Sequence, residues 1–285
     1  MTSPFSPTRP RPGRVGRDLP AAIAVGVALV CLVVAALVVS KLFFVGVVVV
    51  AILLAVHELT TALAVNGTSV PVLPLYLGTV AIVVAAYFGG PDAMVLALAF
   101  TVIATMAWRL PGGAEGYLRD ASAGALCAVY LPFMAGFALL LLQPDDGAWR
   151  VVTFIAVVAA SDTGGYAVGA AVGRHPMAPT ISPKKSWEGF GGSLVASVAA
   201  GVLLVVYALS GPWAAGVALG AATAVTATTG DLLESLIKRD LGIKDMSSLL
   251  PGHGGLLDRL DSLVATVAVA WLVLDVFVPV SAAGL

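Results

Sequence analysis

The chain is a succession of long apolar stretches separated by short polar breaks. Apolar stretches of about 20 residues are long enough to cross the hydrocarbon core of a bilayer as helices. Uninterrupted runs of this length do not fit membrane β-strands, in which apolar and polar residues alternate. The pattern predicts an all-α protein with about nine membrane spans, at roughly residues 20–40, 42–65, 70–89, 92–108, 121–143, 151–172, 191–210, 212–229 and 262–281.

Several breaks between the predicted spans are tight turns. Ser40-Lys41, the segment 66–69, Gly90-Pro91 and the segment around Gly211 consist of residues that favour turns. We therefore expect neighbouring spans to run antiparallel. The stretch before the first span is rich in Pro and Arg and has no apolar period, so residues 1–19 are predicted to be a disordered cytoplasmic tail.

The positive charges predict which side of the membrane each break faces. Cytoplasmic connections of membrane proteins are enriched in Lys and Arg. With the amino terminus inside and nine spans, only Lys41 and Arg150 fall outside. The carboxyl terminus then lies outside, in a multi-pass protein of the inner (plasma) membrane. The inner side holds the other basic residues: Arg9, Arg11, Arg14, Arg17, Arg109, Arg119, Arg174, Lys184, Lys185, Lys238, Arg239, Lys244 and Arg259.

Composition agrees with a membrane protein. The 285 residues are 59% hydrophobic and 11% charged, whereas soluble domains carry about 25% charged residues. A soluble globule, a disordered chain and a disulfide scaffold are therefore excluded. The two cysteines, Cys31 and Cys127, lie in apolar runs and form no CxxC motif, so they are interpreted as small apolar residues.

Two long connections near residues 173–190 and 230–261 hold most of the charge outside the tail. We therefore divide the chain into an N-terminal transmembrane scaffold of about five spans (20–149) and a catalytic transmembrane region of about four spans (150–285). Both long connections belong to the second part and are predicted to face the cytoplasm. The chemistry is expected there, in a polar cavity.

The second long connection has the composition of a phosphate and metal site. Asp231, Ser235 and Lys238 share one face of a helix that continues the eighth span, and Asp258 and Asp261 share a face where the ninth begins. Carboxylates from two helix ends can hold Mg²⁺ together with substrate phosphate oxygens. The turn His253-Gly254-Gly255 leads into a helix N-terminus, which offers donors to phosphates. The alternative is a solvated charged loop.

The first long connection adds a second set of candidates. Asp162 lies within the sixth span, where an ionisable group is expensive and therefore a functional candidate. It could instead make only an interhelical hydrogen bond. Ser182, Lys184 and Lys185 lie at the inner interface, where they would meet anionic headgroups or nucleotide phosphates. Ordinary positive-inside topology also explains the lysine pair.

One further polar pair lies in the second span. His57 and Glu58 resemble half of a zinc motif, but position 61 is Thr, so no H-E-x-x-H follows. We assign them a packing or substrate-lining role. The sequence contains neither a Walker A motif nor a Rossmann G-x-G-x-x-G.

The run SLIKRDLGIKDMSSLLPGHGGLLDRLD, residues 235–261, resembles the signature of the phosphatidate cytidylyltransferase (CDP-diacylglycerol synthase) family. The upstream SDTGGYAVG and ISPKKSWEG also resemble blocks of that family, with Gly165 where a larger residue is expected. The resemblance covers about residues 150–265. The first 140 residues match only as a hydrophobic region.

The resemblance implies an all-helical membrane bundle that makes CDP-diacylglycerol and pyrophosphate from CTP and phosphatidic acid. It implies Mg²⁺ as cofactor and allows K⁺ beside it. By motif, the metal carboxylates correspond to Asp231 and Asp258, with Asp261 close by. Expected partners are the two substrates and the lipid bilayer, with a homodimer plausible for such a bundle and no nucleic acid.

The site residues take their expected roles from this reaction. The basic side chains Lys238, Arg239, Lys244 and Arg259 would meet phosphates or orient carboxylates. The remaining candidates would contact substrate: Asp162, Ser182, Lys184, Lys185, Ser235, His253, Gly254 and Gly255.

Three other readings stay open at this point. Asp162 and Glu58 would suit the ion path of a transporter or channel, although most charges lie in the connections. A polyprenol kinase-like enzyme would also use CTP, but it would transfer the γ-phosphate. A bare membrane scaffold would leave the paired carboxylates without a purpose.

Overall fold

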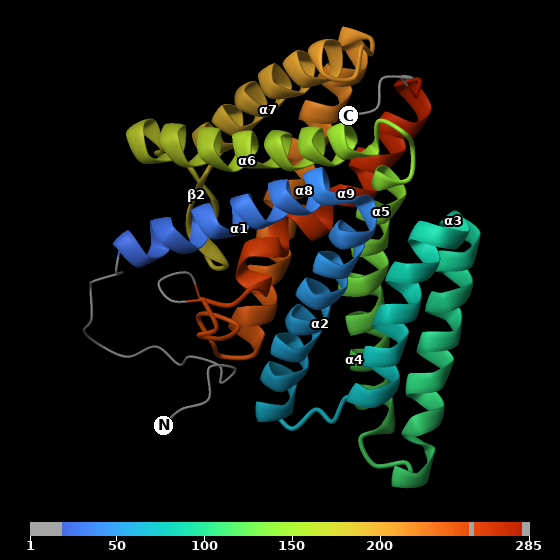
Figure 1. Cartoon of the computed structure of the whole chain (residues 1–285). Helices are drawn as coiled ribbons and strands as arrows, with labels where there is room; N and C mark the ends of the chain where they lie inside the picture. Colours follow the sequence, from blue (N-terminus) through green and yellow to red (C-terminus); the bar gives the residue numbers. More distant parts are fainter. Residues whose placement is uncertain (1–18, 251–253, 281–285) are drawn as a thin grey trace. The chain divides into compact units, whose positions relative to one another are not determined.

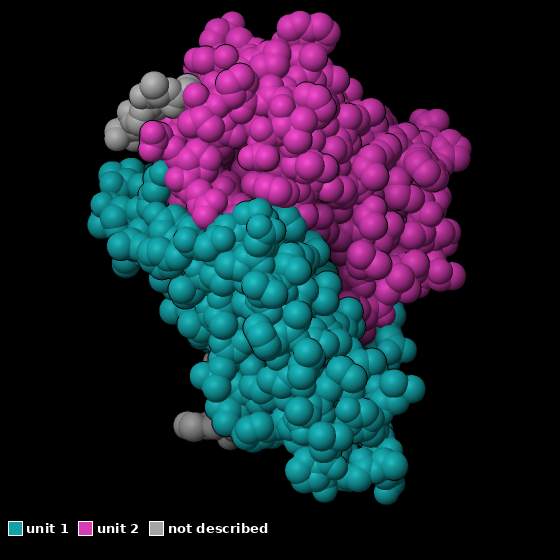
Figure 2. Space-filling view, turned by 90° about the vertical axis from the view of Figure 1, so that its right-hand side faces the viewer, with its two compact units in different colours: residues 1–139, 238–260 teal, residues 140–237, 261–285 magenta. Residues whose placement is uncertain are grey.

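The computed structural model describes residues 19–250 and 254–280, and shows a nearly all-α protein (Figure 1). The predicted tail falls outside the described residues, except for its last position. The chain divides into two compact units, coloured separately in Figure 2. Unit 1 comprises residues 1–139 and 238–260, and unit 2 comprises residues 140–237 and 261–285.

Unit 1 contains most of the N-terminal helices. These are α1 (Leu19–Val39), α2 (Lys41–Val65), α3 (Val72–Trp108), the short η1 (Leu110–Gly112), α4 (Tyr117–Ala128), the π-helical η2 (Val129–Phe133) and the start of α5 (Met134–Leu142). The helix α3 is interrupted at Gly90, where φ is 74° and Pro91 follows. Gly tolerates this backbone angle and Pro lacks the N–H of a regular helix, so the halves match the predicted spans 70–89 and 92–108.

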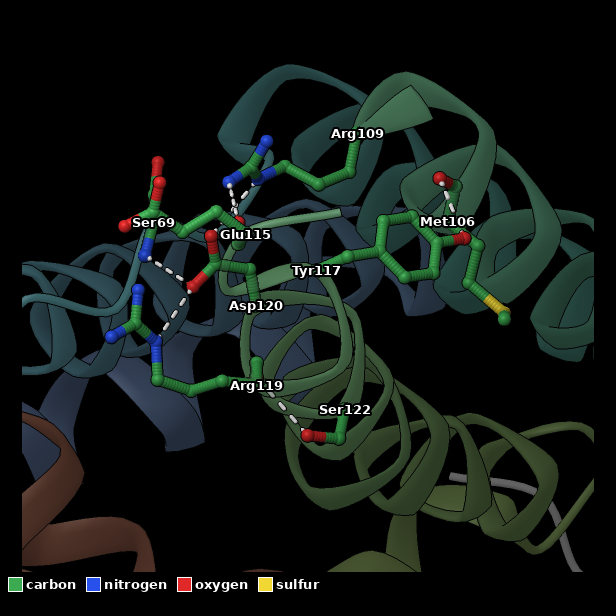
Figure 3. A network of polar contacts seen from close by, with 8 residues as sticks. All are labelled: Ser69, Met106, Arg109, Glu115, Tyr117, Arg119, Asp120 and Ser122. Carbon is green, nitrogen blue, oxygen red and sulfur yellow. Dashed lines mark hydrogen bonds and ion pairs between the residues drawn. The ribbon is translucent and has the colours of Figure 1, made fainter. Parts of the chain in front are cut away.

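A buried carboxylate joins two connections of unit 1. Asp120 accepts hydrogen bonds from the Ser69 backbone N–H at 3.0 Å, Arg109 Nε at 2.9 Å and Arg119 Nε at 3.1 Å (Figure 3). Its side chain is fully buried, so these three donors replace the water it loses. The loop before α3 and the loop after it are therefore tied to the start of α4.

Unit 2 is built on α6 (Gly147–Val172) and α7 (Trp187–Tyr207), with parts of α8 (Trp213–Asp240) and α9 (Leu257–Phe277). The helices α6 and α7 pack backbone to backbone. A Cβ atom added at Gly164 would lie 2.5 Å from the Cβ of Ala196, and one at Gly192 would lie 2.6 Å from the Gly164 carbonyl oxygen. Glycine is therefore required for this approach.

The connection between α6 and α7, predicted as a long one near residues 173–190, contains a β-hairpin that was not predicted. Its strands β1 (Pro176–Ala178) and β2 (Ser182–Ser186) pair antiparallel. The helix α7 also begins earlier than predicted, at Trp187. Ser186 caps it, since its side-chain oxygen accepts a hydrogen bond from the Gly189 N–H at 3.1 Å.

A buried ion pair fixes α9 in unit 2. The Arg150 guanidinium contacts both carboxylate oxygens of Asp146 and donates to the carbonyl oxygens of Leu274 at 2.8 Å and Val278 at 2.9 Å. Leu274 lies in the last turn of α9 and also accepts from the Val278 N–H at 3.2 Å, and Val278 directly follows the helix, where carbonyl groups lack intrahelical partners. The beginning of α6 is thereby attached to the end of α9.

The membrane prediction is supported in its coarser form. Over the described part of the chain, six helices are long and apolar enough to cross a bilayer, and they fit a multi-pass membrane protein. The nine spans of the sequence analysis stay a prediction. The six candidates are Lys41–Val65, Val72–Gly112, Tyr117–Leu142, Gly147–Val172, Trp187–Tyr207 and Leu257–Phe277.

Candidate active site

Unit 2 brings together three predicted carboxylates and one predicted lysine. Asp231 of α8 forms an ion pair with Lys185 of β2 and accepts a hydrogen bond from the Ser262 hydroxyl of α9 at 2.5 Å. Asp162 of α6 lies within electrostatic range of Asp231, Asp261 and Lys185, and within hydrogen-bonding range of Ser262. Four elements therefore supply one group, which we call the acidic cluster: Asp162, Lys185, Asp231, Asp261 and Ser262.

The β-hairpin explains how Lys185 reaches the acidic cluster. Its stem is held by Glu188 at the start of α7, whose carboxylate accepts hydrogen bonds from the N–H groups of Arg174 at 3.1 Å and His175 at 3.2 Å. The His175 ring contacts the other carboxylate oxygen. Lys185 therefore projects from a short strand fixed at its base. Lys184, the next residue toward the amino terminus, is exposed.

The acidic cluster offers carboxylate oxygens, which are the protein ligands that Mg²⁺ prefers. Three carboxylates face one lysine, so the cluster has an excess of negative charge that a divalent cation would neutralise. In residues 19–250 and 254–280, no group of three or more His, Cys, Asp and Glu side chains is arranged so that it could hold a metal ion. Mg²⁺ commonly binds one or two carboxylates and takes its other oxygens from water and substrate phosphates, so two of these carboxylates would be enough.

Asp258 belongs to unit 1, and its carboxylate is hydrogen-bonded by other groups of the chain. It accepts hydrogen bonds from Lys238 Nζ at 2.8 Å and from the N–H groups of Met246 at 3.0 Å and Gly255 at 2.7 Å. Its side chain is only 3% exposed. The structure therefore shows Asp258 fixing the loop between α8 and α9, whereas its predicted contact with a metal stays a prediction.

Glu58 has a structural role that was not predicted from the sequence. From α2 it reaches the loop between α8 and α9, and its carboxylate accepts hydrogen bonds from Ser247 Oγ at 2.6 Å and from the N–H groups of Leu256 at 2.9 Å and Leu257 at 2.8 Å. The side chain is completely buried. Its position inside an apolar span was the available signal, since buried charges need specific partners.

The N–H groups of Gly254 and Gly255, in the predicted phosphate-binding turn, are already hydrogen-bonded within the chain. Gly254 N–H donates to the Leu250 carbonyl oxygen at 3.1 Å, and Gly255 N–H donates to Asp258. The N–H groups at the beginning of α9 donate to Glu58. These N–H groups were expected to face a substrate phosphate. They donate instead to carbonyl and carboxylate oxygens of the chain itself.

The other predicted residues are distributed over both units. Ser235 lies on α8 in unit 2, and Ser182 begins β2. Arg239, Lys244 and Arg259 are exposed residues of unit 1. His253 lies outside the described residues, so its predicted role has no structural description.

Comparison with known proteins identifies the family. A model of the cytidylyltransferase family matches residues 20–277. A phosphatidate cytidylyltransferase of Mycobacterium bovis is 43% identical over 275 residues, which are 92% of this chain and 90% of the relative. The protein of that name from Mycobacterium leprae is 44% identical over 282 residues, covering 92% and 89%.

A more distant relative matches only part of the chain. The phosphatidate cytidylyltransferase of Haemophilus influenzae is 39% identical over 149 residues, covering 48% of this chain and 51% of the relative. The chain belongs to the cytidylyltransferase family, and it is therefore an enzyme, a nucleotidyltransferase.

Proposed function

We propose that the enzyme converts CTP and phosphatidic acid into CDP-diacylglycerol and pyrophosphate in phospholipid biosynthesis. The observation that carries this proposal is the acidic cluster, together with the names of relatives that match most of the chain. Carboxylates beside a lysine are suited to binding a polyphosphate through a cation.

In this reaction an oxygen of the lipid phosphate attacks the α-phosphorus of CTP in line. The new bond joins that oxygen to the α-phosphorus, and the bond from the α-phosphorus to the oxygen bridging to the β-phosphorus breaks, so pyrophosphate leaves. The attacking oxygen is already an anion near neutral pH, so no strong general base is needed. The barrier comes mainly from charge repulsion and positioning.

The chain's own residues address both parts of the barrier. Asp231 and Asp261, with Asp162 beside them, would hold Mg²⁺, and Asp258 stays a predicted further ligand. When bound, the ion would reduce the repulsion between the two anionic substrates. Lys185 lies beside Asp231, where it would meet the triphosphate, and the exposed Lys184, Arg239, Lys244 and Arg259 would attract phosphates. A potassium ion beside magnesium stays a proposal.

The membrane setting follows from the substrates. Phosphatidic acid stays in the bilayer, whereas CTP is a cytosolic polyanion. We place the site at the inner headgroup level of the cell membrane, with nine spans, the amino terminus inside, the carboxyl terminus outside and a polar cavity open to the cytoplasm. The distribution of Lys and Arg supports this orientation. A homodimer stays part of the proposal.

The deciding experiment follows the cytidylyl group. Purified protein in mixed micelles would receive phosphatidic acid, Mg²⁺ and CTP labelled at the α-phosphate. We expect label in an organic-phase lipid, release of pyrophosphate, and loss of both with EDTA. Label transferred only from γ-labelled CTP would indicate a kinase instead. Ion flux in liposomes without lipid labelling would indicate a transporter.

Variants of the two aspartates give a residue-level test. We expect Asp231→Asn and Asp258→Asn to lower turnover by about 100-fold or more, because each removes a negative charge that the reaction needs. Asp92→Asn is the matched control, since Asp92 is an exposed aspartate on α3. Turnover by Asp258→Asn at the wild-type rate would refute the predicted role of Asp258.

A further inference from the structure

The loop between α8 and α9 is held by two buried carboxylates from different parts of the sequence. Asp258 comes from α9, next to the loop, whereas Glu58 comes from α2 and lies 189 positions before its partner Ser247. Between them they accept six hydrogen bonds from the loop, from Lys238 and from the first residues of α9. The described parts of this loop, up to residue 250 and from residue 254, are therefore fixed in part by these two carboxylates.

We propose that Glu58 is a positioning residue for the cytidylyl transfer, acting through the loop that joins Lys238 of α8 to Asp258 of α9. This inference rests on the proposed function. Glu58 does not belong to the signature run, and its side chain contacts Ser247 and the beginning of α9, so its effect on the reaction passes through the shape of the loop.

The surroundings of Glu58 offer hydrogen-bond donors to both of its carboxylate oxygens. The N–H groups of Leu256 and Leu257 point at Glu58 from the N-terminus of α9, where the helix dipole is positive. A buried anion is stable only where donors of this kind replace its water. A glutamine side chain has one acceptor oxygen, and its NH₂ group would oppose an N–H donor. Glu58→Gln therefore keeps the volume and loses the contact pattern.

Gly255 shows how closely the two carboxylates enclose the turn. A Cβ atom added there would lie 2.9 Å and 3.1 Å from the carboxylate oxygens of Glu58 and 3.0 Å from Oδ2 of Asp258. Such distances are shorter than normal van der Waals contact, so the backbone passes between the two acids with no room for a side chain. A shift of Glu58 would therefore move Gly255 and Asp258 together.

Hydrogen exchange followed by mass spectrometry tests the contact directly. In Glu58→Gln we expect the amides of residues 246–250 and 254–257 to exchange faster, because at least one of the two amides that donate to Glu58 loses its acceptor and the others lose the fixed backbone. Peptides from α6 and α7 would exchange as in the wild type. This readout does not require the enzyme to turn over, so it stays informative even if the wild type transfers no cytidylyl group and the proposed function fails.

Kinetics tests the consequence for the reaction. We expect Glu58→Gln to lower kcat by about 10- to 100-fold, a range typical of lost positioning, with KM for CTP changed by less than about threefold. Ser247→Ala, which removes a single donor to Glu58, should give a smaller loss of the same kind. It also keeps the test decisive if Glu58→Gln does not fold.

Asp120 supplies the matched control. It is also a fully buried carboxylate of unit 1 with three donors, but these are Ser69, Arg109 and Arg119 (Figure 3). Asp120→Asn should lower thermal stability and leave the exchange of residues 246–250 and 254–257 unchanged. Our inference would be overturned by wild-type kcat and exchange in Glu58→Gln, or by an equal loss of kcat in folded Asp120→Asn.

Discussion

At the scale of single residues, Gly255 gives the most direct test of the loop. Gly255→Ala places a Cβ atom about 3 Å from oxygens of Glu58 and Asp258, so the turn must open. We expect cytidylyl transfer to fall by about 10-fold or more. Gly191→Ala is the control, since a Cβ atom there meets nothing within 4 Å. Initial rates of lipid labelling would be measured for both variants. Equal rates would show that a Cβ atom at position 255 does not disturb the turn.

The two neighbouring lysines of β2 make a second residue-level prediction. Lys185 contacts Asp231, whereas Lys184 is exposed. Lys185→Gln should therefore raise KM for CTP and lower kcat, by about 10-fold or more in kcat/KM, and Lys184→Gln should change it by less than about threefold. Steady-state kinetics at saturating phosphatidic acid would measure both. Equal losses of kcat/KM would show that the contact with Asp231 does not make Lys185 more important for the reaction than Lys184.

Part of the candidate site could be predicted because its residues are unusual where they occur. Asp162 is an acid inside an apolar span, and Asp231 and Asp261 lie at the ends of spans, so hydropathy alone marks them. The contact of Glu58 with Ser247 could not be predicted, because it joins segments 189 positions apart. Helical periodicity describes one face of one helix and does not identify its partner.

At the scale of elements, the attachment of α6 to α9 predicts a stability effect. Arg150→Met leaves Asp146 buried with its guanidinium partner removed and withdraws the donors from Leu274 and Val278. Loss of one partner of a buried pair costs about 3–5 kcal/mol, so we expect a markedly lower midpoint of thermal unfolding in detergent.

A double variant separates the ion pair from the rest of this attachment. Replacing both partners, in Asp146→Leu with Arg150→Met, also removes the carboxylate that has lost its guanidinium partner and should recover part of the loss. A double variant no more stable than Arg150→Met alone would show that the contacts of Arg150 with the Leu274 and Val278 carbonyls, rather than its ion pair with Asp146, dominate.

The elements themselves were predictable to different degrees. Long apolar runs determine the membrane helices, and the Gly90-Pro91 break was visible as a turn. The hairpin was not predicted because SPKKS, the sequence of β2, has no alternation of apolar and polar residues. Its strands are held by pairing with each other and by Glu188 at the base, which a local pattern does not reveal.

At the scale of the whole molecule, the odd number of predicted spans places the two chain ends on opposite sides of the membrane. A cysteine appended to the carboxyl terminus should react with a membrane-impermeant maleimide in intact cells, and one appended to the amino terminus should react only after lysis. The background for both is a variant with Cys31 and Cys127 replaced by Ala. Labelling of both ends on the same side would require an even number of spans.

The division into units has a consequence for exchanging parts between family members. Residues 238–260 belong to the same compact unit as residues 1–139, and hydrogen bonds of Glu58 and Asn66 link them. In a chimera that takes its N-terminal half from another family member, the loop between α8 and α9 would be held by residues of that other protein. Such hybrids should work only where the incoming half brings a carboxylate to the place of Glu58. An isolated C-terminal fragment would carry the whole signature run without the acid that holds it.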